Sequence, residues 1–145
     1  SYGCQCIVLA IDAYKDQSNF KSWYNVSTHG GKKKTDIDAL EWAIKAEKNG
    51  AGEILLTSMN ADGTKLGYDI ELTSKISTEV SIPVIASGGA GKPIDMVNVL
   101  NKGNASAVLA ASIFHFGIYS IENVKKEMLK YEIPIRKTWW KFDWL

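Results

Sequence analysis

Two short runs of small residues in the second half of the chain have the composition of a phosphate site. Ser87–Gly91 follows the apolar run Ile82–Ala86, and Ala110–Ser112 follows the next apolar run. Each therefore lies where a predicted strand ends and a helix should begin. Glycine lets the backbone approach an anion closely, and the free N–H groups at a helix start, with the positive end of the helix dipole, favour negative charge. The backbone N–H groups expected to bind the phosphate belong to Gly88, Gly89, Ala111 and Ser112.

A carboxylate lies at the end of the first predicted strand. Asp12 follows the apolar run Cys4–Ile11 and shares a strand face with Val8 and Ala10. These small side chains suit the interior of a barrel, and a carboxylate at its mouth is poorly solvated and suited to general acid–base catalysis. The spacing alone leaves open that Asp12 only caps a helix or tethers a loop.

Alternating strand and helix patterns position these residues. Strands are predicted over 4–11, 53–58, 82–87 and 107–111. Helices are predicted over 36–49 (capped by Thr35), 69–79, 93–101, 112–116 and 121–131, and a polar loop over 13–34 with a short hairpin at 20–26. This order predicts an α/β fold with a four-stranded parallel sheet and right-handed crossovers, the (βα)4 half of a TIM-type (βα)8 barrel. Its two unpaired edges call for a partner.

Length and composition set the broad class. The chain has 145 residues, 46% hydrophobic and 23% charged, as in one globular domain. A net charge of +1 predicts no attraction to nucleic acid or membranes. No apolar run approaches the roughly 20 residues of a membrane span, and no signal-peptide pattern is evident, so we expect a cytoplasmic protein. Cys4 and Cys6 are expected to be buried, reduced thiols, and no metal site is expected. Because an apolar pattern typical of a strand begins almost at Ser1, we interpret the sequence as a piece of a longer protein or an engineered fragment.

The chain divides into residues 1–136, the predicted half-barrel domain, and residues 137–145, an aromatic-rich tail. Trp139, Trp140, Phe142 and Trp144 crowd this tail. Aromatic side chains at this density rarely stay exposed. We expect them to cover an edge or groove, on this chain or on a neighbour.

The order of seven segments closely resembles the C-terminal half of the HisF family, the cyclase subunits of imidazole glycerol phosphate synthase. The segments are Ala10–Ala13, His29–Lys32, Gly50–Ser58, Asp62–Thr64, Gly67–Asp69, Ile85–Gly91 and Ala110–Phe116. The resemblance extends from Tyr2 to Arg136. It implies strands five to eight of a (βα)8 barrel, and the tail departs from the family.

The resemblance also implies a reaction in histidine biosynthesis. Ammonia from a glutaminase partner subunit attacks a phosphoribulosyl substrate with a phosphate at each end, giving imidazole glycerol phosphate and an aminoimidazole carboxamide ribotide. No metal or organic cofactor is implied. Two copies of the chain, or this chain and an N-terminal half, would close eight strands. The isolated chain is expected to show weak or no turnover.

The resemblance assigns roles to residues on the strand ends. Asp12 matches one of two catalytic aspartates, and the other lies on a strand that this chain lacks. Asp62 matches a substrate contact and Gly63 a phosphate-binding amide, although an Asp-Gly turn explains both as well. Thr57 and Ser87 are expected to line the mouth below the phosphate.

Glu53 and the basic and histidine residues allow more than one interpretation. Glu53 matches a charged ring that gates ammonia entry at the opposite barrel end, but simple exposure there is an alternative. Lys32–Lys34 is either a solvated charge run or part of a loop that folds over the substrate. His29 and His115 are too far apart in sequence to suggest a metal site, and His115 is expected to pack against the short helix.

Two further functions remain open. The sister isomerase of the same pathway shares the barrel and an Asp-Gly-Thr turn, although Glu53 and Ser112–Phe116 favour the cyclase; turnover of the isomerase's aminoaldose substrate alone would reverse that choice. The third possibility is a phosphate-binding fragment without catalysis, which an assay with ammonia and substrate would separate from the cyclase.

Overall fold

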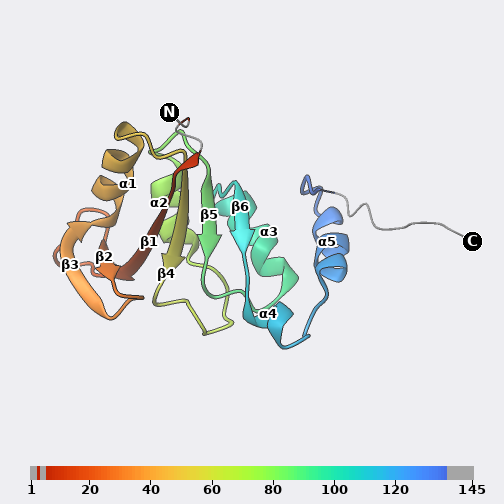
Figure 1. The fold of residues 1–145 in the computed structure, drawn as a ribbon. Coiled ribbons are helices and arrows are strands. Elements are labelled where there is room, and N and C mark those ends of the chain that lie inside the picture. The colour runs from red at the N-terminus through yellow and green to blue at the C-terminus, as the bar shows by residue number, and fades with distance from the viewer. Residues whose placement is uncertain (1–2, 4–5, 137–145) are drawn as a thin grey trace, which may run out of the picture.

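The computed structural model describes residue 3 and residues 6–136, which form a six-stranded sheet flanked by helices (Figure 1). The strands are β1 (Val8–Lys15), β2 (Tyr24–Thr28), β3 (Lys33–Asp38), β4 (Glu53–Ser58), β5 (Val84–Ser87) and β6 (Ala107–Leu109). The helices are α1 (Ala39–Lys48), α2 (Ile70–Ser77), α3 (Pro93–Lys102), α4 (Ser112–His115) and α5 (Ile121–Leu129). Cys4 and the predicted aromatic tail, residues 137–145, lie outside the described residues.

Four of the strands form the parallel arrangement that the sequence predicts. The strand order is β3-β2-β1-β4-β5-β6, and β1, β4, β5 and β6 are parallel neighbours. Apolar runs bounded by helices produce such a sheet because each helical crossover returns the chain in the same direction. The predicted βα order is confirmed, with β5 beginning at Val84 and β6 ending at Leu109.

The prediction of a polar loop over 13–34 is wrong. β1 extends to Lys15, and β2 and β3 form an antiparallel hairpin beside it, so the sheet has six strands instead of four. Tyr24 is fully buried, and the hydroxyl of Thr35 donates a hydrogen bond to the carbonyl oxygen of Val26 at 2.7 Å. The predicted hairpin at 20–26 is also misplaced, since the turn between β2 and β3 lies at His29–Lys32.

The first helix begins three residues later than predicted. Asp38, not Thr35, is the N-cap: its carboxylate accepts hydrogen bonds from the N–H groups of Leu40 (2.9 Å) and Glu41 (3.2 Å). The same carboxylate accepts one from the N–H of Ser22 at 2.9 Å. One aspartate therefore starts α1 and fixes the turn that leads into β2.

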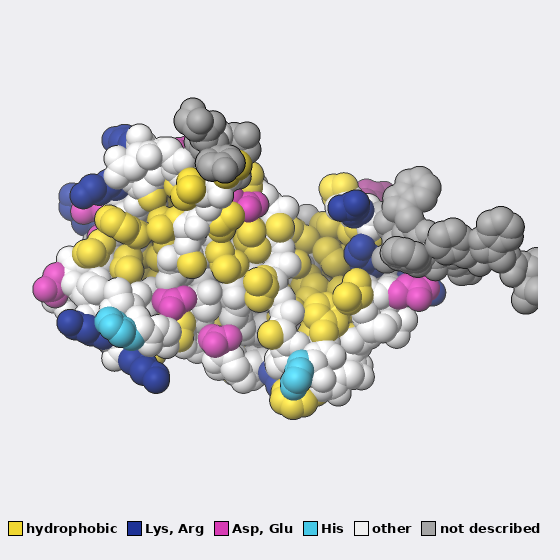
Figure 2. Space-filling view, in the orientation of Figure 1, with side chains coloured by type: hydrophobic (Ala, Val, Ile, Leu, Met, Phe, Trp, Pro, Cys, Tyr) yellow, Lys and Arg dark blue, Asp and Glu magenta, His cyan; other side chains and the backbone are white. Residues whose placement is uncertain are grey.

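The core lies on one face of the sheet only. Alternate residues of the parallel strands, such as Ile11, Leu56 and Val84, pack in one cluster with Leu72 and Ile76 of α2. A second cluster joins α3, α5 and the end of the sheet. The opposite face carries Val8, 51% exposed, and Leu109, 42% exposed, and Figure 2 shows apolar side chains spread across it.

The amino-terminal part differs from expectation in two respects. The first strand begins at Val8 rather than at residue 4, and Cys6 is exposed, so the prediction of a buried thiol is wrong for Cys6. It fails because Cys6 lies two residues before the sheet begins. Within the described part of the chain, no helix has the length and hydropathy needed to cross a bilayer.

Candidate functional site

Four residues form a row across the carboxyl ends of the parallel strands. The register pairs Asp12 with Thr57, Thr57 with Ser87, and Ser87 with Leu109. Paired residues of neighbouring strands point to the same face, and the strands lie roughly 4.8 Å apart. All four residues are on the face that no described helix covers. Asp12, Thr57 and Ser87, each of which the sequence predicts at the mouth of the strands, therefore lie side by side on neighbouring strands.

A small pocket lies above one end of this row. Its volume is about 140 Å³. The predicted site residues that line it are Asp62, Gly63, Ser87, Gly88, Gly89, Ala111 and Ser112. Lys65, Ala90, Leu109 and Ala110 complete the lining. Three separate loops, after β4, β5 and β6, thus converge on one hollow, while Asp12, Thr57 and Glu53 are not among the lining residues.

The glycines bring two of these loops into direct backbone contact. Gly88 has φ +89° and Gly89 has φ +100°, a region that side chains disfavour. A Cβ on Gly88 would lie 2.8 Å from the carbonyl oxygen of Ser58, and one on Gly89 would collide with the carbonyl of Gly67. The N–H of Gly67 donates to the carbonyl oxygen of Gly89 at 2.8 Å. Glycine is needed at these two positions because the backbone packs closely against the loop after β4, and not against a helix.

Tyr68 fixes the same loop to the end of β6. Its hydroxyl donates a hydrogen bond to the carbonyl oxygen of Leu109 at 2.9 Å. Burial, and to a lesser degree the Asp95 carboxylate, raises the pKa of this hydroxyl above its ordinary value. Tyr68 therefore remains a neutral donor at physiological pH and holds the loops after β4 and β6 together around the pocket.

The start of α4 contributes backbone N–H groups. Ala111 is the N-cap of α4 and Ser112 is its first helical residue. The carbonyl oxygen of Ala111 accepts bonds from the N–H groups of Phe114 (3.1 Å) and His115 (2.9 Å). The amides before Phe114 have no carbonyl one turn earlier in the helix to bind. They lie at the wall of the pocket formed by Ala111 and Ser112.

Lys65 is a pocket residue that sequence reasoning missed. It has φ +59° and is the one cationic residue in the lining of this pocket. Its ammonium lies 5.5 Å from the centre of the Phe116 ring, which also contacts His115 edge-on at 5.1 Å. The available signal was a lysine immediately after the Asp62–Thr64 turn. Only the fold shows that the loop after this turn returns to Gly89 and Gly91, which follow β5.

Asp12 and Glu53 occupy opposite ends of the uncovered face. Asp12 is half-buried, and its backbone carbonyl accepts a hydrogen bond from the hydroxyl of Ser27 at 3.0 Å. Glu53 begins β4 beside Val8, is half-buried, and has no ion-pair partner among the described residues. Both interpretations of Glu53, a charged ring completed by another chain and simple exposure, therefore remain compatible with its position.

The basic run belongs to the hairpin. Lys33 and Lys34 lie in β3, and the register aligns Lys34 with Ser27, which in turn aligns with Asp12. Lys34 is thus on the face of Asp12, with its ammonium 5.1 Å from the centre of the Tyr14 ring. No cluster of three or more His, Cys, Asp or Glu residues in the described part could hold a metal ion.

Comparison with known proteins establishes the family. A family model described as "Histidine biosynthesis protein" matches residues 1–120. The chain belongs to this family. It is 58% identical over 135 residues to "Imidazole glycerol phosphate synthase subunit HisF" of Dehalococcoides mccartyi strain BAV1, a match that covers 93% of this chain and 52% of that protein. The protein of the same name from Caulobacter vibrioides strain NA1000 is 53% identical over 136 residues, 94% of this chain and 52% of that protein.

These matches confirm the HisF resemblance. They also show that the chain spans about half the length of the curated relatives it matches. The family and the parallel sheet together identify an α/β portion of a TIM-type barrel.

Proposed function

We propose that this chain is the C-terminal half-barrel of a HisF-type cyclase and binds one phosphate of a bis-phosphate substrate at the carboxyl ends of β5 and β6. The convergence of seven sequence-predicted residues on one pocket, at the edge of the row that contains Asp12, supports the proposal. Loops after the last two strands are the usual phosphate site of (βα)8 barrels.

The chemistry of the pocket suits a phosphate. The proposed donors are the backbone N–H groups of Gly63, Gly88, Gly89, Ala111 and Ser112. Lys65 adds a positive charge from the opposite loop. Asp62, also in the lining, is proposed to accept hydrogen bonds from substrate hydroxyl groups beside the phosphate. A volume of about 140 Å³ suits one terminal group, so the rest of the substrate would extend over the uncovered face toward Asp12.

Asp12 is the proposed acid–base group of this half. Asp12 lies beside Thr57, which in turn lies beside Ser87 in the pocket. Asp12 is therefore placed to contact the part of a substrate that extends beyond the phosphate. The second catalytic aspartate and the second phosphate site would come from the other barrel half. Ammonia would enter at the Glu53 end, react with the phosphoribulosyl substrate, and yield imidazole glycerol phosphate and the aminoimidazole carboxamide ribotide.

The proposal includes a partner for the uncovered face. Leu55 and Ile85 lie in the middle of that face and are only partly buried. The strands β3 and β6 form the two ends of the sheet. A second copy or an N-terminal half would cover these residues and pair with the free edges. A glutaminase subunit would then bind at the end that carries Glu53.

Reconstitution tests this function. The chain is mixed with a separately produced N-terminal half of a HisF relative, and imidazole product is measured with ammonia and the phosphoribulosyl substrate. We expect product from the mixture and little or none from the chain alone. Asp12→Asn should abolish turnover in the mixture, whereas Asp16→Asn, in the exposed turn after β1, should not. Full activity of Asp12→Asn would refute the assigned role.

A second candidate, phosphate binding without catalysis, is favoured by one observation. The chain covers about 52% of the length of these relatives, and Asp12 is not among the residues that line the phosphate pocket. Phosphate binding with no turnover in the reconstituted mixture would support this function over the cyclase.

A further inference from the structure

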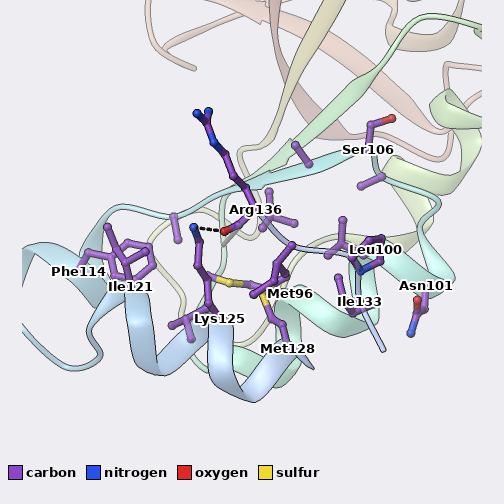
Figure 3. Close-up of a pocket in the computed structure, with 17 residues that line it drawn as sticks. Met96, Leu100, Asn101, Ser106, Phe114, Ile121, Lys125, Met128, Ile133 and Arg136 are labelled. Atoms are coloured by element: carbon purple, nitrogen blue, oxygen red, sulfur yellow. Dashed lines mark hydrogen bonds between the residues drawn. The ribbon is translucent and has the colours of Figure 1, made fainter. Parts of the chain in front are cut away.

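A second hollow, larger than the phosphate pocket, borders it at Ala110, which lines both. It is a groove of about 680 Å³ between α3, the edge strand β6, α5 and the last described residues (Figure 3). Met96 and Leu100 come from α3, and Val124 and Met128 from α5. Pockets of roughly 300–1,000 Å³ hold drug-sized molecules, so this groove can accommodate more than one aromatic ring.

The groove is apolar with a cationic rim. Met96, Val124 and Met128 are buried at its floor, while Ile121 at the rim is 57% exposed. Lys125 and Arg136 are its charged residues, and the ammonium of Lys125 donates to the carbonyl oxygen of Arg136 at 2.7 Å. Thioether sulfur and alkylammonium or guanidinium groups all interact favourably with aromatic rings. An aromatic ligand therefore fits both the floor and the rim.

The chain itself supplies such a ligand. Arg136, the last described residue, lines the groove, so residues 137–145 start at its rim. These nine residues contain Trp139, Trp140, Phe142 and Trp144. An extended chain covers up to about 3.3 Å per residue, which allows the segment to return over the groove. Tethering at Arg136 also gives it a high effective concentration there.

We propose that residues 137–145 dock in this groove and cover the apolar surface beside the β6 edge, with indole rings over Met96 and Met128. The docked segment lies over the groove between β6, α3 and α5, whose residues Met96, Val124 and Met128 line it. This inference does not depend on the proposed function, because the groove shares only Ala110 with the lining of the phosphate pocket and contains none of the residues proposed to bind the substrate.

The three methionines of the chain provide the test. Met96 and Met128 line the groove, whereas Met59 follows β4 and packs against Gly31. The methyl signals of these residues are recorded by NMR on the methyl-labelled full chain and on its Trp139→Ala/Trp140→Ala variant. Ring currents from docked indoles should displace the Met96 and Met128 signals upfield in the full chain, and the double substitution should remove that displacement. The Met59 signal should not change.

Matched variants distinguish docking from a general change. Trp23→Ala removes a partly exposed indole beside Lys75, remote from the groove, and should leave the Met96 and Met128 signals in place. Ile121→Ser at the rim should weaken docking and move these signals toward those of the double variant. A chain ending at Arg136, which keeps every described residue, should reproduce the double variant.

Three outcomes would overturn the proposal. Identical Met96 and Met128 signals in the full chain and the double variant would mean that the indoles do not reach the groove. Displacement that disappears on dilution, together with a dimer mass by light scattering, would mean that a second copy's tail fills it. An equal effect of Trp23→Ala would mean that the signals report overall structure.

Discussion

Lys65 gives the proposed phosphate pocket a positive charge that glycine-rich turns alone do not provide. It enters from the loop after β4, opposite the turns after β5 and β6. A phosphate held only by neutral N–H groups would gain less than one that also meets an ammonium, because charge-assisted hydrogen bonds are about twice as strong. We therefore assign to Lys65 the largest single side-chain contribution to anion binding.

Replacement of Lys65 by methionine tests this assignment. A hydrogen bond to a charged group contributes about 1.5–3 kcal/mol, so Lys65→Met should weaken binding of inorganic phosphate by roughly tenfold or more, measured by calorimetry. Lys92→Met, a cation at the start of α3 outside the pocket, is the control and should have little effect. An equal loss in both variants would show that only net charge matters.

The small residues that line the pocket could be predicted from the sequence, but its cationic residue, Lys65, could not. The small residues after β5 and β6 were recognisable because strand, turn and helix follow directly in the chain. Lys65 was not, because its approach depends on backbone contacts of Gly67 and Lys65 with Gly89 and Gly91. Such contacts join loops that are more than twenty residues apart in sequence.

At the scale of elements, the hairpin β2–β3 is joined to α2 by a buried hydroxyl. Tyr24 is fully buried, and its hydroxyl donates to a carboxylate oxygen of Asp69, the N-cap of α2, at 3.0 Å. Asp69 also accepts from the hydroxyl of Ser58, at 3.1 Å, and from the N–H of Leu72, at 3.0 Å. One aspartate thus connects the hairpin, the end of β4 and the start of α2 below the site.

Removal of the Tyr24 hydroxyl should loosen this connection. Tyr24→Phe is expected to lower the free energy of unfolding by about 1 kcal/mol, the usual net value of a hydrogen bond. Burial first, and then the Asp69 carboxylate, raises the pKa of Tyr24 above its ordinary 10.0. Its contribution is therefore complete below about pH 10 and is lost as the pH rises toward the folded-state value. Urea unfolding from pH 8 to 11 should show a smaller alkaline loss in the variant, and identical profiles would contradict this.

The hairpin also shows where sequence reasoning about elements fails. Parallel βα units were predictable because their buried strands are continuous apolar runs. β3, in contrast, reads as a polar segment, and two possible caps, Thr35 and Asp38, lie three residues apart. The choice between them depends on Tyr24 and Val26, whose burial creates a strand for Thr35 to join.

At the scale of the molecule, the uncovered face of the sheet is the main unfinished surface. Helices pack on one face, and the other presents the row of Asp12, Thr57 and Ser87 above an apolar middle that includes Leu55. An apolar face of this kind is typical of an interaction surface. If the chain is a half-barrel, this face is covered either by an N-terminal half-barrel or by a second copy of the chain.

A charge in the middle of this face should prevent association. Leu55 pairs with Ala10 on one side and Ile85 on the other. We expect sedimentation analysis to find the chain as a dimer, and Leu55→Glu to give a folded monomer because a carboxylate would be buried without a partner. A change of equal charge on the exposed outer surface, Thr78→Glu at the end of α2, should leave the dimer intact. A folded wild-type monomer at all concentrations would rule out self-pairing.

Phosphate titration of the amide signals by NMR is the decisive measurement for the proposed phosphate site. Inorganic phosphate should shift the signals of Gly88, Gly89, Ala111 and Ser112, and Ser112→Asp should abolish these shifts through charge repulsion. Ser120→Asp adds the same charge at the N-cap of α5, where aspartate is also a good cap, and should preserve them. An absence of shifts at these four residues, or an equal loss in Ser120→Asp, would contradict the phosphate site.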